Sequence, residues 1–123
     1  MSFNFIQQLP SPDEIIERMP LSEKAKQLKA ERDTIIRNIL EGKDDRFILI
    51  IGPCSADNET AVIDYMRRLA IIQKEVEDKI LIIPRIYTNK PRTTGEGYKG
   101  MVHQPDANKK ADMNEGILAI RRL

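Results

Sequence analysis

The sequence predicts an α/β protein in which a strand–helix–strand unit follows an α-helical extension. Two observations carry this prediction. Residues 47–51 are apolar at every position and rich in β-branched side chains, a pattern typical of a strand buried on both faces of a parallel sheet. A helical pattern and a second apolar run at residues 80–83 follow with short connections, which is the order of a βαβ unit with parallel strands.

Composition excludes several classes of protein. The 123 residues carry 20 Lys and Arg against 19 Asp and Glu, a net charge of +1. This excludes the strongly basic surface of a dedicated nucleic-acid binder. A hydrophobic content of 41% fits a single folded domain, and a single cysteine excludes an internal disulfide. We find neither a membrane-spanning run nor a signal peptide, so we expect no membrane partner and a cytoplasmic location.

Two helices are predicted ahead of the first strand, at about residues 12–19 and 23–41. Ser11 and Glu14 have the spacing of a capping box at the start of the first helix. Ser22 is a suitable N-cap for the second. We therefore expect the first helix to begin directly after Ser11 and the second directly after Ser22.

The polar turn after the second helix divides the chain. Residues 1–44 are expected to form a helical N-terminal extension. Residues 45–123 are expected to form the first βαβ portion of a larger α/β protein, because parallel sheets normally need more than two strands and cover on both faces. A last helical pattern starts near residue 117.

The connecting helix is predicted at about residues 57–77, with Asp57 or Asn58 as its cap. The second strand is expected to continue to Tyr87. Pro84 lies inside it and has no N–H to donate, so we expect a bulge or a local break there. The buried stripe of the helix is expected to comprise Val62, Met66, Leu69, Ile72 and Val76.

Chemistry is expected where the two strands end, because the carboxyl ends of parallel strands form the binding edge of α/β sheets. Cys54 follows the first strand, and Arg85, Lys90 and Arg92 follow or end the second. If the strands are neighbours, these four side chains face one opening. The cations suit phosphate or carboxylate groups, since arginine can bind two oxygens at once.

Less specific interpretations of the same residues remain open. Cys54 suits a nucleophile or a metal ligand, but a lone cysteine after a strand also suits a small buried apolar residue. The cations also fit an ordinary solvated loop, within the long aperiodic stretch 88–111. His103 lies in that stretch without a partner at ligand spacing and is interpreted as a surface histidine.

Three segments together carry a resemblance to a known family. They are IGPCS at 51–55, RIY at 85–87 and KPRTT at 90–94. With this spacing the chain resembles the type I 3-deoxy-D-arabino-heptulosonate 7-phosphate synthases, also called phospho-2-dehydro-3-deoxyheptonate aldolases, over roughly residues 9–123. The related octulosonate 8-phosphate synthases have Lys-Ala-Asn-Arg-Ser in place of KPRT, which favours the heptulosonate branch.

The resemblance implies a fold and a reaction. The family fold is a (β/α)₈ barrel with an N-terminal extension, so this chain is expected to form the front third of such a barrel. Family members condense phosphoenolpyruvate with erythrose 4-phosphate and water to give the heptulosonate 7-phosphate and phosphate. This is the first step of the shikimate pathway to the aromatic amino acids. We expect the parent enzyme to be a homo-oligomer.

The resemblance also implies roles for individual residues. Cys54 corresponds to the cysteine that, with a His, a Glu and an Asp, binds a divalent metal of the Mn, Fe, Co or Zn class. Arg85 and Lys90 correspond to catalytic residues of the phosphoenolpyruvate site. Lys90, Pro91, Arg92 and Thr93 correspond to the loop that holds erythrose 4-phosphate.

The family's other metal ligands lie on later barrel strands that these 123 residues do not include. We therefore expect the chain by itself to be inactive, as the front third of a synthase. The alternatives are a non-catalytic fragment that acts as a binding or interaction module, and a small independent phosphate-binding protein.

Overall fold

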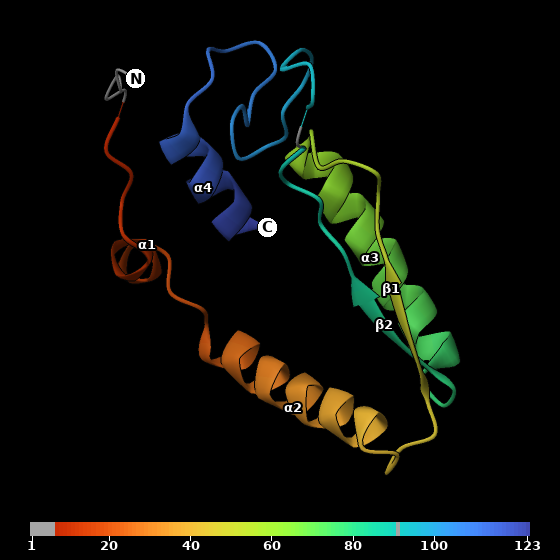
Figure 1. The fold of residues 1–123 in the computed structure, drawn as a ribbon. Helices are drawn as coiled ribbons and strands as arrows, with labels where there is room; N and C mark the ends of the chain where they lie inside the picture. Colours follow the sequence, from red (N-terminus) through yellow and green to blue (C-terminus); the bar gives the residue numbers. More distant parts are fainter. Residues whose placement is uncertain (1–6, 91) are drawn as a thin grey trace.

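The computed structural model describes residues 7–90 and 92–123. Figure 1 shows two helices ahead of a small sheet, one helix between its strands, and a last helix after a long loop. The predicted helices and strands are confirmed, with shifted ends. The elements are α1 (Pro12–Arg18), α2 (Glu23–Leu40), β1 (Phe47–Ile51), α3 (Glu59–Val76), β2 (Ile80–Pro84) and α4 (Met113–Arg122).

The predicted caps begin three of these helices. The Ser11 hydroxyl accepts from the backbone N–H of Glu14, and the Glu14 carboxylate accepts from the N–H of Ser11 in return. Ser22 caps α2 by accepting from Ala25. Of the two candidates for α3, Asn58 is the cap. Each contact satisfies a backbone N–H that the helix itself leaves without a partner.

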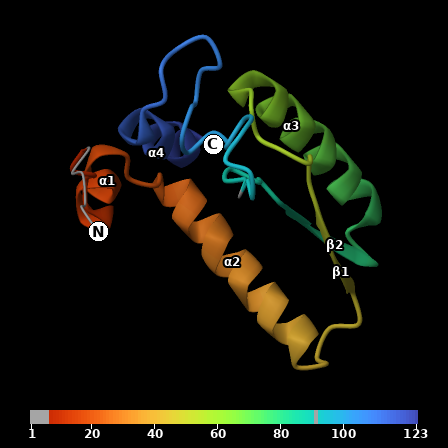
Figure 2. The same cartoon turned by 45° about the horizontal axis from the view of Figure 1, so that its top comes forward.

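The strands β1 and β2 pair in parallel, as predicted, from Phe47 opposite Ile80 to Ile51 opposite Pro84. The pairing extends one hydrogen bond beyond each end of this register. The Phe47 N–H donates to the carbonyl of Lys79 at 2.8 Å, and the Arg85 N–H donates to the carbonyl of Ile51 at 2.8 Å. Figure 2 shows α3 running alongside the two strands that it connects. The sheet therefore holds the ends of β1 and β2 side by side.

The bulge or break expected at Pro84 is wrong, because the register is continuous up to this residue. Backbone groups of a strand alternate between its two edges. Since Lys79 and Arg85 bond to β1, the odd-numbered positions face β1 and Pro84 faces the opposite edge. The missing N–H is therefore not needed for the β1–β2 ladder. Regular strand structure does end at Pro84, not at Tyr87 as expected.

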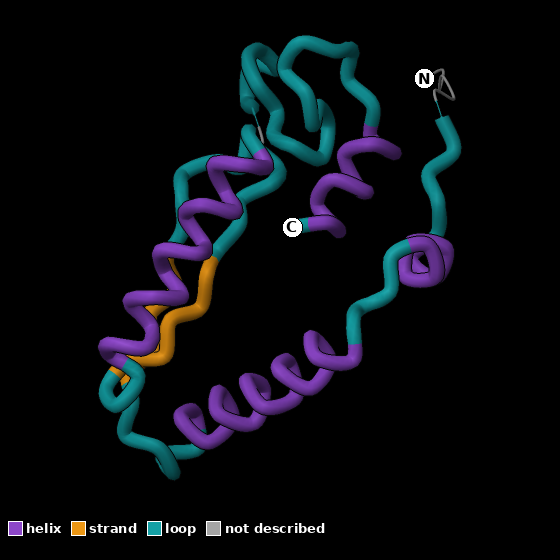
Figure 3. Tube along the Cα trace, turned by 180° about the vertical axis from the view of Figure 1, so that it is seen from behind, coloured by secondary structure: helices purple, strands orange, loops and turns teal. Residues whose placement is uncertain are grey.

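The expectation that β1 is buried on both faces is also wrong for the described residues. Phe47 is 68% exposed and Ile50 is 64% exposed. The helix α3 packs against β2, whereas α2 contacts β1 but lies at an angle to the strands, as Figure 3 shows. The apolar character of β1 therefore exceeds what its neighbours among residues 7–90 and 92–123 cover.

The buried stripe of α3 agrees with the prediction only in part: Val62 and Leu69 are buried, and Met66 and Val76 are partly buried. Gln73 is buried as well, whereas Ile72 is 45% exposed. Steps of three and four residues lead from Val62 through Met66 and Leu69 to Gln73, and such steps keep to one helical face. Ile72 lies one residue off that line. A polar amide thus occupies a core position next to the sheet.

One buried cluster joins the parts of the chain that follow the strands. It consists of Ala56, Val62, Met101 and Ala119, all at most 3% exposed. These residues come from the loop after β1, from α3, from the long loop and from α4. The long loop is therefore anchored by Met101. Among the described residues no helix has the length and apolar character needed to cross a membrane.

Candidate functional site

The carboxyl ends of the strands approach each other closely. A Cβ atom at Gly52 would overlap the carbonyl group of Arg85, so this position requires glycine. Further on, the N–H of Ala56 donates to the carbonyl of Tyr87 at 2.9 Å. The residues after β1 are thereby held against those after β2, with Cys54 between the two contacts.

Cys54 and Lys90 form the centre of the site. The ammonium of Lys90 donates to the Sγ atom of Cys54 at 3.1 Å, and the thiol is exposed. Lys90 lowers the pKa of Cys54, first through this hydrogen bond and then through its charge; burial opposes the shift, and the charges of Arg85 and Arg92 add to it. The arrangement therefore favours the thiolate, the form of cysteine that binds metals and acts as a nucleophile.

Arg85 is fixed by two contacts. Its Nη2 donates to the carbonyl of Pro53 at 3.0 Å, and its guanidinium lies over the ring of Tyr87, 5.2 Å from the centroid. The ammonium of Lys90 lies 5.6 Å from the same centroid. An aromatic face attracts cations at such distances, so Tyr87 holds both positive groups at one place. Sequence reasoning assigned Tyr87 no role, although it lies two residues beyond Arg85, the spacing of one strand face.

The loop that carries Arg92 folds back on itself. The backbone N–H of Lys90 donates to the carbonyl of Lys99 at 2.9 Å, and the Nε of Arg92 donates to the carbonyl of Tyr98 at 3.0 Å. Gly100 has φ 102° and packs against the backbone of Thr88, where a Cβ would overlap. These contacts bring Arg92 close enough for its charge to act on Cys54.

Tyr98 ties this loop to the residues after β1. Its hydroxyl lies 3.2 Å from the carbonyl oxygen of Gln104 and 3.4 Å from that of Ala56. Burial raises the pKa of Tyr98, and the charge of Asp57 adds to the increase. The hydroxyl therefore stays protonated and able to donate. Sequence reasoning missed this residue because its contacts are with backbone carbonyls, which leave no mark in a sequence pattern.

The structure brings together three of the predicted residues, Cys54, Arg85 and Lys90, and places Arg92 beside them. Thr93 is exposed in a turn closed by the Gly95 N–H and the Arg92 carbonyl at 3.0 Å. Pro91 lies outside the described residues. His103, interpreted as a surface residue, is partly buried, with its Nε2 3.2 Å from the Oδ1 of Asn89.

The basic side chains of the site have no carboxylate partner in the described part of the chain. Within residues 7–90 and 92–123 the ion pairs involve other side chains, and none includes Arg85, Lys90 or Arg92. Cations without carboxylate partners suit a ligand that brings its own negative charge, such as a phosphate or a carboxylate. The same residues hold no group of three or more His, Cys, Asp or Glu that could bind a metal ion.

Comparison with known proteins shows which family the chain is similar to. The model of the DAHP synthetase I family matches residues 18–120. Phospho-2-dehydro-3-deoxyheptonate aldolase of Haemophilus influenzae is 37% identical over 118 residues, which cover 96% of this chain and 32% of the relative. The phenylalanine-inhibited aldolase of Saccharomyces cerevisiae is 41% identical over 117 residues, 94% of this chain and 31% of the relative.

A solved structure shows the same likeness in three dimensions. The phospho-2-dehydro-3-deoxyheptonate aldolase of Francisella tularensis superposes with a TM-score of 0.86 at 31% sequence identity. The match covers 96% of this chain and 34% of that one. The chain thus spans about a third of the length of the relatives that it matches. Since the family model covers most of the sequence, including both strands and the cationic loop, the chain belongs to the DAHP synthetase I family.

Proposed function

We propose that this chain carries part of the active site of a 3-deoxy-D-arabino-heptulosonate 7-phosphate synthase. The reaction condenses phosphoenolpyruvate with erythrose 4-phosphate and water, and releases phosphate. One observation carries the proposal: Arg85, Lys90 and Arg92 lie together at the carboxyl ends of β1 and β2, and no carboxylate among the described residues pairs with them. Both substrates carry a phosphate, and phosphoenolpyruvate adds a carboxylate, so several cations are needed.

In this proposal β1 and β2 are the first strands of a (β/α)₈ barrel, whose sites lie at the carboxyl ends of the strands. Arg85 and Lys90 bind the phosphate and carboxylate of phosphoenolpyruvate. Lys90, Pro91, Arg92 and Thr93 form the loop that holds erythrose 4-phosphate. Tyr87 supports the first pair by lying under both cations.

Cys54 is proposed as a single ligand, in its thiolate form, for a divalent ion of the Mn, Fe, Co or Zn class. Its lowered pKa and exposed position suit such a role. A catalytic metal site uses about three protein ligands, and the described residues hold no cluster of that size. Cys54 could therefore be only one member of the site, and these residues alone are expected to show no synthase turnover.

Ligand binding to the isotopically labelled chain tests the proposal. Phosphoenolpyruvate should shift the backbone amide resonances around Cys54, Arg85 and Lys90, and inorganic phosphate should do so only at higher concentration because it lacks the carboxylate. Lys90→Gln and Arg85→Gln should each weaken binding about 10- to 100-fold, the usual effect of losing a charge-assisted hydrogen bond.

Lys79→Gln is the matched control, since it removes an exposed lysine at the opposite end of β2. An equal loss of binding in this variant would contradict a defined site. A chain that binds neither substrate but assembles with other chains would favour the interaction-module alternative. Phosphate release in the presence of Mn²⁺ above that of a Cys54→Ala variant would contradict the expected inactivity of these residues alone.

A further inference from the structure

The backbone of Ala56 joins three segments of the site. Ala56 lies two residues after Cys54 and is fully buried, with 0% of its surface exposed. Its N–H donates to the carbonyl of Tyr87 at 2.9 Å, which ties it to the residues after β2. Its carbonyl oxygen lies 3.4 Å from the hydroxyl of Tyr98, which ties it to the long loop. One buried residue therefore connects the chain after β1, the chain after β2 and the long loop.

Tyr98 links Arg92 to this junction. The Nε of Arg92 donates to the backbone carbonyl of Tyr98 at 3.0 Å, and the hydroxyl of the same tyrosine contacts Ala56. The residues between them, 93–97, are all exposed. Exposed loop residues contribute few packing contacts that could hold a side chain in place. The position of Arg92 therefore depends on the position of Tyr98.

The base of the loop is closed without the Tyr98 hydroxyl. The N–H of Lys90 donates to the carbonyl of Lys99 at 2.9 Å, and the N–H of Val102 donates to the carbonyl of Thr88 at 3.1 Å. Met101, 1% exposed, anchors the same base in the buried cluster that contains Ala56. Loss of the hydroxyl should therefore loosen Arg92 while the base of the loop keeps its structure.

The hydroxyl of Tyr98 is engaged by the protein's own backbone. It lies between the carbonyl oxygens of Ala56, at 3.4 Å, and Gln104, at 3.2 Å. A hydroxyl has a single proton to donate, and both of these neighbours accept. Tyr98 would therefore act on a ligand through Arg92, and not by donating to the ligand itself.

We propose that Tyr98 is a positioning residue that holds Arg92 in place to bind the phosphate of erythrose 4-phosphate. The inference rests on the proposed function, in which Arg92 belongs to the loop that holds this substrate. A side chain that is ordered before the ligand arrives lowers the entropy cost of binding. Phosphoenolpyruvate is assigned to Arg85 and Lys90, which Tyr87 holds, so its binding should not depend on Tyr98.

The variant Tyr98→Phe removes the hydroxyl and keeps the ring. Calorimetric titration should show binding of erythrose 4-phosphate weakened by about tenfold, the effect of losing one hydrogen bond, and binding of phosphoenolpyruvate unchanged. Tyr65→Phe is the matched control, because it removes the same group from a partly buried tyrosine of α3, and it should change neither affinity. Unchanged binding of erythrose 4-phosphate in Tyr98→Phe, or an equal loss for both substrates, would overturn the proposal.

A double-mutant cycle with Arg92→Gln separates positioning from a general structural role. If Tyr98 acts through Arg92, its hydroxyl has nothing to position once the guanidinium is gone. The double variant should then bind erythrose 4-phosphate as weakly as Arg92→Gln alone, since coupled residues are not additive. Losses that add in the double variant would show that the two residues act independently, which contradicts the proposal.

A measurement without ligand distinguishes failure of this inference from failure of the proposed function. Hydrogen exchange of the Arg92 Nε–H, followed by NMR at mildly acidic pH, reports its bond to the carbonyl of residue 98. Exchange should be faster in Tyr98→Phe than in the unmodified chain and unchanged in Tyr65→Phe. If the unmodified chain binds neither substrate, the proposed function fails, and this exchange still tests the positioning of Arg92. An exchange rate that Tyr98→Phe does not alter would overturn the inference.

Discussion

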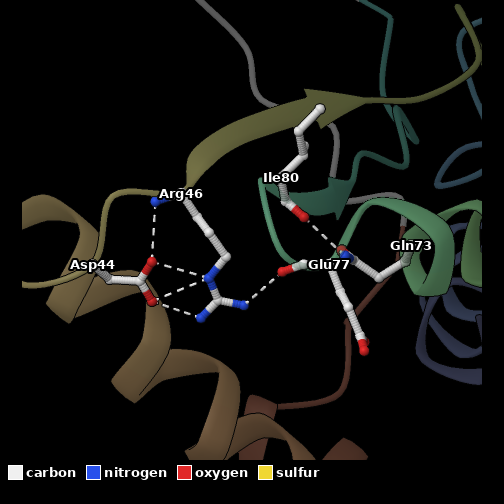
Figure 4. Close-up of polar contacts among 5 residues, drawn as sticks. All are labelled: Asp44, Arg46, Gln73, Glu77 and Ile80. Atoms are coloured by element: carbon white, nitrogen blue, oxygen red, sulfur yellow. Dashed lines mark hydrogen bonds and ion pairs between the residues drawn. The ribbon is translucent and has the colours of Figure 1, made fainter.

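The two ends of the parallel strands differ in how their charges are matched. At the amino end, the Nη2 of Arg46 lies 2.6 Å from the Oδ2 of Asp44, and its Nη1 donates to the carbonyl of Glu77 at 3.3 Å (Figure 4). At the carboxyl end, Lys90 is bonded to a thiol and Arg85 to a backbone carbonyl. At the amino end the positive charge is thus paired with a carboxylate, whereas at the carboxyl end the positive charges of Lys90 and Arg85 are not.

This difference separates a structural role from a binding role. The pKa of Asp44 is lowered by its hydrogen bonds with Arg46, so cation and anion satisfy each other and fix the chain where it enters β1. At the carboxyl end the charges of Lys90, Arg85 and Arg92 all act on one thiol. Positive charge in excess of its local partners is available to an anionic ligand. The carboxyl end is therefore the binding end.

The largest effect is expected from Gly52→Ala, which forces the strands apart at the carboxyl end. The added methyl group would overlap the backbone of Arg85, and backbone can relieve the overlap only by moving. Overpacking of this kind costs about 3 kcal/mol of unfolding free energy or more. Urea denaturation followed by circular dichroism measures the loss.

Gly95→Ala is the control for Gly52→Ala. Gly95 has φ +73° and no atom within 4 Å of an added Cβ. Alanine at this position therefore costs only the strain of a left-handed backbone, about 1–2 kcal/mol of unfolding free energy. Equal losses in the two variants would show that the close approach of β1 and β2 at Gly52 is not what holds this end together.

The second largest effect on stability is expected from Asp44→Asn, at the amino end of the strands. A carboxylate whose pKa is lowered in the folded state stabilises the fold above its unfolded pKa, about 3.9. That contribution is lost as the pH falls through the lower folded pKa. The variant should therefore be less stable than the unmodified chain at pH 7, and the difference should be smaller at pH 2. A stability difference that is the same at both pH values would contradict the role of the Arg46 pair.

Much of this arrangement could be predicted from local sequence. The capping box at Ser11 and the apolar run of β1 determine their elements through short-range physics, namely hydrogen bonds to helix N–H groups and the strand preference of β-branched side chains. The meeting of Cys54 and Lys90 followed from one topological rule, that parallel strands bring their carboxyl ends together. The individual roles assigned by resemblance remain proposals.

The features that were not predicted depend on contacts between residues that are far apart in the sequence. Gln73 was not expected in the core because apolar periodicity overlooks a polar residue whose partners are backbone groups of β2. Pro84 predicted a break because the sequence does not say which edge a residue faces. Tyr98 was missed for the same reason as Gln73, since backbone carbonyls accept its hydrogen bond.

A smaller effect, confined to chemistry, is expected from Lys90→Gln. Lys90 is the main cause of the lowered pKa of Cys54, so its loss should raise that pKa toward the ordinary value of a cysteine. Because the thiolate is the reactive form, the pH midpoint of alkylation by iodoacetamide should move upward. Lys79→Gln should leave the midpoint where it is. A midpoint unchanged in Lys90→Gln would contradict the Cys54–Lys90 hydrogen bond.

The smallest effect is expected from Arg92→Gln, measured in the same alkylation assay. Arg92 makes no hydrogen bond to Cys54; its Nε is bonded to the carbonyl of Tyr98, and its charge is the weakest of the influences that lower the pKa of the thiol. An exposed charge that acts through solvent is screened by salt within about 10 Å at 0.1 M ionic strength. The midpoint should therefore rise less than in Lys90→Gln, and added salt should abolish the difference from the unmodified chain. A rise as large as that of Lys90→Gln, or one that persists at high salt, would mean that Arg92 contacts the thiol directly and that the loop lies closer to Cys54 than its bond to Tyr98 allows.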